Sequence, residues 1–232
     1  MLFKFKKKKI TLDFYTDNYA VYDLFKIEKT NRHKPKWLTT DLPIKHCAGL
    51  TDFMSRSYVI RSWSEILIHY NNDGTVFTAA SDPLLAIEEN PISDRGLFLP
   101  QDKYQHLKIM VPWYAYPSHS IPCAFYGASW HNDRYIDYLS YLPSIRDFYY
   151  SRLWNVHFIL NKTNMPNETE IINPGDPLQY FIPLTDKKVE VRNHYDPDMV
   201  NRLKDYQPQL FSLQGKCYFR LKSLIKNKEN RK

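Results

Sequence analysis

Hydrophobic and polar positions alternate along several short segments of the chain, as they do in strands that bury one face. The clearest segment is WNVHFIL at 154–160. Its buried face is predicted to consist of Trp154, Val156, Phe158 and Leu160. Apolar runs at 106–116 and 121–127 predict two further strands, joined by a turn at 117–120.

Turn-forming residues divide the other apolar segments into short strands. Pro174, Gly175, Asp176 and Pro177 force a tight turn, so that 171–191 reads as strand, turn, strand, turn and strand. The turn sequence NNDG at 71–74 predicts a hairpin between 65–70 and 75–80, preceded by a strand at 57–62. Residues 19–29 also predict a strand, whereas Cys47, Leu50 and Met54 have helical spacing and predict a short helix.

The C-terminal part of the chain has helical signals instead. Asp196 is a good N-cap and Pro197 suits the first helical position. A second helix is predicted from about residue 209, with one apolar and one basic face. We therefore expect a mainly β protein, a jelly-roll or β-sandwich-like domain at 11–195, with a basic tail at 1–10 and a basic helical appendage at 196–232.

Composition agrees with a folded chain that carries an unusual number of aromatic rings. Of its 232 residues, 43% are hydrophobic and 16% are aromatic, including 18 tyrosines. Six glycines against 15 prolines argue against a glycine-rich nucleotide-binding fold. The chain has no apolar run long enough to span a membrane and no secretory signal, and its three distant cysteines suit free thiols in a reducing compartment.

Positive charge is concentrated at the two ends of the chain. Residues 1–10 carry a net charge of +5 and residues 216–232 carry +6, which leaves −4 for the rest of a chain whose total is +7. Such basic ends suit contact with nucleic acid or with an acidic surface, and they also keep termini soluble. The candidate anchoring residues are Lys6, Lys7, Lys8, Lys9, Lys216, Arg220, Lys222 and Lys226.

Three blocks together resemble an uncharacterised family of proteins encoded by tailed phages, especially marine cyanophages. They are the helix, strand and turn at 45–74, the strands around a Pro-Trp pair at 107–127, and the segment 153–191 with GDPLxYxxPLTD at its end. The resemblance implies a phage origin and a single β-rich domain, and it assigns no catalytic residue.

One alternative is a cupin-like metal enzyme of the iron and 2-oxoglutarate type. His131 and Asp133 form an HxD motif, and His194 is a distal histidine that could complete a facial triad. However, residues 194–196 also form an HxD, which indicates that the motif recurs here by chance. A loop histidine at 131 and a helix cap at 196 are the competing interpretations.

The dense aromatic region at 113–150 suits either a contact surface or a packed core. We take Trp113 and Trp130 as candidate contact residues. The resulting hypothesis is a non-enzymatic phage protein, without a cofactor, that acts in the virion or the host cytoplasm. It would bind other phage proteins through aromatic loops and nucleic acid or an acidic surface through its basic tails, within an oligomeric assembly. A host-directed effector is the remaining alternative.

Overall fold

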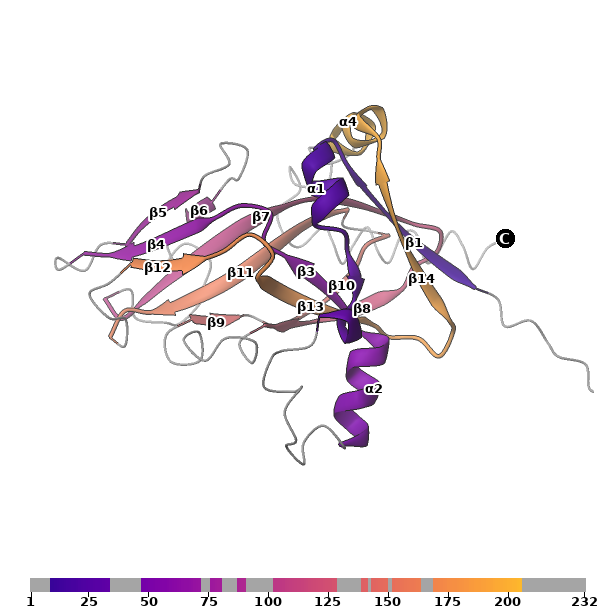
Figure 1. Cartoon of the computed structure of the whole chain (residues 1–232), viewed down its shortest axis with the longest axis horizontal. Helices are drawn as coiled ribbons and strands as arrows, with labels where there is room; N and C mark the ends of the chain where they lie inside the picture. The colour runs from indigo at the N-terminus through magenta and orange to yellow at the C-terminus, as the bar shows by residue number, and fades with distance from the viewer. Residues whose placement is uncertain are drawn as a thin grey trace, which may run out of the picture.

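The computed structural model describes nine ranges of the chain, and the strands among them form three sheets (Figure 1). The described residues are 9–33, 47–71, 76–80, 87–90, 102–128, 139–141, 143–149, 152–163 and 169–205. The fold is mainly β and sandwich-like, as the sequence predicts.

The first sheet has the order β14-β1-β7-β11-β9, with β6 paired to β7 beside this path. Its strands are β14 (Val189–Tyr195), β1 (Ile10–Thr16), β7 (Tyr104–Pro117), β11 (Leu153–Asn161), β9 (Leu139–Tyr141) and β6 (Ile87–Asn90). The pair β1–β14 is parallel and the other pairs of this sheet are antiparallel.

Two smaller sheets complete the β structure. The second has the order β10-β8-β13-β3-β2, and the third has the order β12-β4-β5. Their strands are β10 (Ser144–Asp147), β8 (Pro122–Gly127), β13 (Pro177–Pro183), β3 (Tyr58–Arg61), β2 (Glu28–Lys29), β12 (Thr169–Ile172), β4 (Ile66–Tyr70) and β5 (Val76–Ala80). The helices are α1 (Tyr19–Leu24), η1 (Thr30–Arg32), α2 (Ala48–Arg56) and α4 (Pro197–Asp205).

Aromatic rings fill the space between the first and second sheets. Phe14 and Trp154 come from the first sheet, Phe125 and Phe181 come from the second, and Phe148 lies just beyond β10. The ring contacts among these five residues have centroid distances of 5.1 Å to 6.0 Å. All five side chains are fully buried, so the aromatic content of the sequence largely serves the core.

A buried hydrogen bond also joins these two sheets. The indole Nε1 of Trp154 on β11 donates to Oε1 of Gln179 on β13 over 2.9 Å. Both side chains are almost completely buried, and the bond gives each polar group the partner that burial requires.

The second and third sheets meet where one long ladder bends. β3 and β13 pair in the second sheet, and the same two chain segments continue as β4 and β12 in the third. Between them, Ser62 N–H donates to the carbonyl of Asp176 over 2.8 Å, and Gly175 N–H donates to the carbonyl of Ser62 over 2.7 Å. Gly175 has a φ of 93°, which glycine adopts readily, and so it forms the predicted turn.

Two local contacts join the first and second sheets. At one edge, the Asn193 side chain of β14 donates to the carbonyl of Ile27 and accepts from its N–H, both over 3.0 Å. Ile27 directly precedes β2, so this clamp joins the edges of the first and second sheets. Elsewhere, Gly127 of β8, an inner strand of the second sheet, lies against Tyr141 of β9, an edge strand of the first.

Most sequence-based element predictions are confirmed. The hairpin is β4–β5, the helix near Cys47 is α2, and the strands at 106–116, 121–127 and 154–160 are β7, β8 and β11. The four residues predicted for the apolar face of β11 are all buried. Asp196 caps α4, because its Oδ1 accepts from the N–H of Met199 over 2.9 Å.

The prediction of a strand at 19–29 is wrong. Residues 19–24 form α1, because the Asn18 side chain accepts from the N–H of Val21 over 3.2 Å and caps the helix. Only Glu28 and Lys29 form a strand there. Strand β1 was not predicted, and it begins at Ile10, the last residue of the predicted basic tail.

The predicted second C-terminal helix lies outside the described residues, as do Lys6, Lys7 and Lys8. None of the helices in the described ranges has the length and apolar character needed to span a lipid bilayer.

Candidate binding surfaces

The outward side of three neighbouring strands presents a grid of nine polar and aromatic residues, here called the β1 face. Because side chains alternate along a strand, the apolar positions of β1 point into the core and the intervening positions point outward. Strand register places the outward residues in three rows across β14, β1 and β7. The rows are Glu190, Thr11 and Ser118; Arg192, Asp13 and Tyr116; and His194, Tyr15 and Tyr114.

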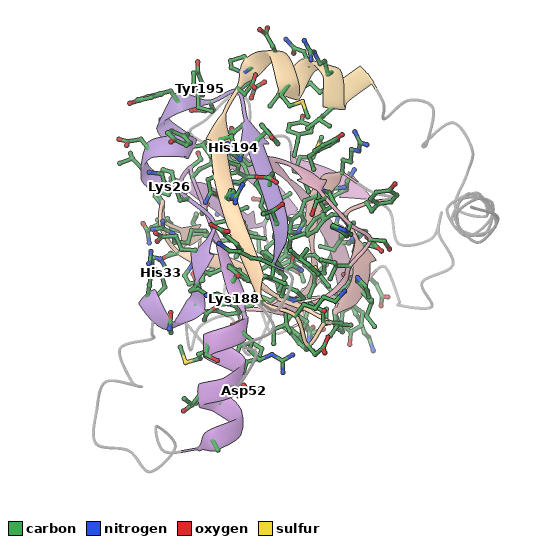
Figure 2. The ribbon with its side chains drawn as sticks, turned by 90° about the vertical axis from the view of Figure 1, so that its right-hand side faces the viewer. Lys26, His33, Asp52, Lys188, His194 and Tyr195 are labelled. Atoms are coloured by element: carbon green, nitrogen blue, oxygen red, sulfur yellow. The ribbon has the colours of Figure 1, made fainter. Side chains whose placement is uncertain are left out.

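The row that contains His194 is ordered by stacking and by a carboxylate. The imidazole of His194 stacks on the Tyr15 ring with a centroid distance of 4.7 Å and an interplanar angle of 19°. Its Nε2 is 2.9 Å from Oδ1 of Asp13, which accepts the hydrogen bond. Figure 2 shows His194 over β14, close to β1. The His194 ring is thus held nearly parallel to the Tyr15 ring, while 37% of the His194 side chain stays exposed.

Cations lie over or beside the other rings of the β1 face. The Arg152 guanidinium lies over the Tyr116 ring at 4.8 Å from its centroid, and the Lys204 ammonium lies 5.7 Å from the Tyr114 centroid. Lys204 also pairs with Asp17 over 2.7 Å, which ties α4 to the end of β1. Such pairs combine a flat apolar ring with a positive charge.

Two pKa shifts follow from this arrangement. Hydrogen bonds from Lys9 and Arg192 hold the pKa of the Glu190 carboxyl below its usual value. Burial, with a further contribution from the negative charge of Asp13, raises the pKa of the Tyr15 hydroxyl. At neutral pH the acid is therefore ionised and paired, and the phenol is neutral and can donate a hydrogen bond.

A second surface, here called the tyrosine patch, lies where α1 meets the end of β14. It consists of Tyr19, Tyr22, Lys26 and Tyr195. The three tyrosine rings contact one another with centroid distances of 5.5 Å to 6.4 Å, and Lys26 lies over the Tyr22 ring. Tyr195 lies toward α1, away from His194 (Figure 2).

The tyrosine patch is unusual because two of its three rings remain in solvent. Tyr19 is 63% exposed and Tyr195 is 45% exposed, whereas Tyr22 is partly buried and packs against the core. Aromatic rings elsewhere in the described chain mostly fill the core. Exposed tyrosines that already contact one another form a preorganised apolar surface with polar hydroxyl groups, as contact residues in protein interfaces do.

The candidate residues chosen from the sequence have different outcomes. Trp113 is a correction: only 2% of it is exposed, because the alternation along β7 points it into the core. Lys9 pairs with Glu190 at the edge of the β1 face. The remaining candidates lie outside the described residues: Trp130, His131, Asp133, Lys216, Arg220, Lys222 and Lys226.

His194 is the one residue of the proposed metal triad whose surroundings can be described. It contacts Tyr15 and Asp13, and Asp196 is occupied as the cap of α4. Across the described ranges, no group of three or more His, Cys, Asp or Glu side chains is placed to hold a metal ion.

Sequence reasoning missed the principal residues of both surfaces. A signal for the β1 face was present, since ITLDFYT at 10–16 alternates between apolar residues and Thr11, Asp13 and Tyr15. The tyrosine patch had no comparable signal, because it brings together residues 19–26 and 195 by folding.

Comparison of the chain with protein-family models, with curated proteins and with solved structures finds no match.

Proposed function

We propose that this chain is a non-enzymatic binding protein of a tailed phage and that it contacts another phage protein through the tyrosine patch. The observation that carries the proposal is the cluster of Tyr19, Tyr22 and Tyr195, whose rings contact one another and of which Tyr19 and Tyr195 are exposed. The phage origin rests on the three sequence blocks that resemble the phage family.

The chemistry of the patch suits a protein partner. Tyrosine offers a large ring with few rotatable bonds, so little conformational entropy is lost when it is covered. Lys26 supplies a positive charge at the rim, over the Tyr22 ring. A central aromatic cluster with a charged rim is the arrangement found in protein interfaces.

The test is quantitative mass spectrometry of gradient-purified phage particles. We expect a fixed copy number per particle for the wild-type protein. A Tyr19→Ala, Tyr195→Ala double variant, supplied to a phage that lacks the gene, should lose most of its incorporation. The matched control is Tyr126→Ala, which removes a tyrosine of 42% exposure from β8, away from the patch.

The outcomes separate the candidate functions. Incorporation that is unchanged in the double variant would overturn the assignment to the tyrosine patch. A protein that is abundant in infected cells but absent from particles would overturn the structural role and favour the host-directed effector. Circular dichroism of the purified variants establishes that they fold.

A further inference from the structure

We propose that the β1 face binds single-stranded nucleic acid, with bases stacked on Tyr116 and on the His194–Tyr15 pair. This surface is separate from the tyrosine patch, since His194 and Tyr195 lie on opposite sides of β14. The proposal therefore does not depend on a protein partner at the patch.

Aromatic rings lie side by side on the outward side of β14, β1 and β7. Tyr15 and Tyr114 are directly paired across β1 and β7, and Tyr116 is opposite Asp13 one row away. His194 extends the row of Tyr15 onto β14. Tyr116 is 42% exposed, so a base can reach its ring. Every base has a flat face, so stacking on such rings tolerates different sequences.

Positive charges lie beside these rings. Arg152 already lies over the Tyr116 ring, and Arg192 occupies the same row on the other side of Asp13. A guanidinium in this position can bind a phosphate while the neighbouring ring holds the base. Asp13 is engaged with His194, and the single carboxylate of Glu190 pairs with two cations, Lys9 and Arg192, so this group keeps a net positive charge for a phosphate.

Of the lysines near the start of the chain, the structure describes Lys9, which pairs with Glu190 in the row that also holds Thr11 and Ser118. In the sequence, Lys4, Lys6, Lys7 and Lys8 precede Lys9 and Ile10, where β1 begins. Lysines favour nucleic acid because they neutralise its sugar-phosphate backbone.

The arrangement favours single strands over duplexes. In a duplex the faces of the bases are stacked on one another, so rings that project from a sheet cannot reach them. Phosphate contacts alone do not require exposed tyrosines. A surface that offers both exposed rings and positive charges is therefore best suited to a strand whose bases are unpaired.

The test is fluorescence anisotropy with a labelled oligouridylate of about 20 nucleotides and the full-length protein, at several salt concentrations. We expect salt-dependent binding that is stronger than for a duplex of equal length. Tyr116→Leu should weaken binding about 5- to 100-fold, the range for loss of one stacked base. The matched control is Tyr126→Leu, which removes an equally exposed tyrosine from the second sheet and should stay within about twofold.

Two further variants make the result decisive. Arg192→Gln should weaken binding and reduce its dependence on salt, because a phosphate contact is lost. Tyr19→Ala in the tyrosine patch should leave binding unchanged. No binding of the oligonucleotide, or equal binding of the duplex with no effect of Tyr116→Leu, would overturn the proposal. The latter result would assign the affinity to the lysines alone.

Discussion

At Gly127 the missing side chain makes room for the ring of Tyr141. A Cβ atom added there would overlap with the Cβ and ring carbons of Tyr141, which belong to β9. We expect Gly127→Ala to lower the free energy of unfolding by about 1–3 kcal/mol, because one strand must move away from the other. Urea denaturation measures this change.

Gly49 provides the matched control for the same substitution. It lies in α2, and an added Cβ would approach only the Cys47 sulfur, at 3.9 Å. Gly49→Ala should raise the free energy of unfolding by up to about 1 kcal/mol, since alanine favours helix. Equal effects of the two substitutions would contradict the predicted contact between β8 and β9.

Lys29 is a residue whose charge opposes folding. Burial, followed by repulsion from Arg56, lowers the pKa of its ammonium from 10.5 to about 8. Between these two values the unfolded chain binds more protons than the folded chain, so the stability contributed by this site rises with pH. Its ammonium lies 4.0 Å from the Tyr58 ring centroid and donates to the Arg56 carbonyl.

Denaturation of the wild type and of Lys29→Met between pH 7 and pH 10.5 tests this expectation. The stability of the wild type minus that of the variant should increase as the pH rises above about 8. Arg56→Gln should shift this increase toward higher pH, because it removes the repulsive charge. A stability difference between wild type and variant that does not change with pH would contradict the lowered pKa of Lys29.

Among the secondary-structure elements, β14 depends on the side chain of one asparagine at its open edge. Asn193 makes two hydrogen bonds to the backbone of Ile27 and so covers part of an edge that could otherwise pair with another chain. Asn193→Ala should lower the free energy of unfolding by about 1–2 kcal/mol and should speed amide hydrogen exchange in residues 25–29. Hydrogen exchange with mass spectrometry measures both the exchange and its location.

The Asp variant at the same position sharpens the result. Asn193→Asp keeps an acceptor for the Ile27 N–H but places a second acceptor against the Ile27 carbonyl. We expect Asn193→Asp to be at least as destabilising as Asn193→Ala. If both variants exchange like the wild type in 25–29, the clamp does not hold the two sheets together.

Local sequence was enough to predict some of the strands and helices but not the way in which the strands pair. Strands such as β11 and β7 were predictable because one face is buried and the pattern repeats every two residues. Residues 19–24 were wrongly predicted as a strand because Tyr and Val favour strands, whereas capping by the Asn18 side chain stabilises a helix. Which strands share a sheet was not predictable, since β3–β13 and β1–β14 are set by contacts distant in sequence.

On the scale of the whole molecule, β14 connects the two candidate surfaces. His194 belongs to the β1 face and its neighbour Tyr195 belongs to the tyrosine patch. The two surfaces differ in charge, because the β1 face includes Arg192 and the Arg152 guanidinium lies over its Tyr116 ring, whereas Lys26 is the one charged residue of the tyrosine patch. Nucleic-acid binding should therefore weaken with salt, whereas contacts at the apolar patch should depend on it much less.

Site prediction from sequence failed at this scale for a physical reason. Trp113 was taken as a candidate contact residue, and it instead fills the core together with Trp154, whose burial was predicted. Exposure is a property of the assembled sheets, so Tyr116 and Trp113, on the same strand, have opposite roles. The alternation of β7 contained this difference, but only the completed sandwich shows which side faces solvent.

The parallel pairing of Ile10 with Val189 has a consequence for synthesis on the ribosome. β1 is translated before every other described strand, yet its partners β7 and β14 are made much later. The nascent chain thus carries the apolar side of β1, with Leu12 and Phe14, uncovered through most of translation. We therefore expect this domain to complete its folding only after its last strand has been made, so that the unfinished chain exposes apolar surface of the kind that chaperones bind.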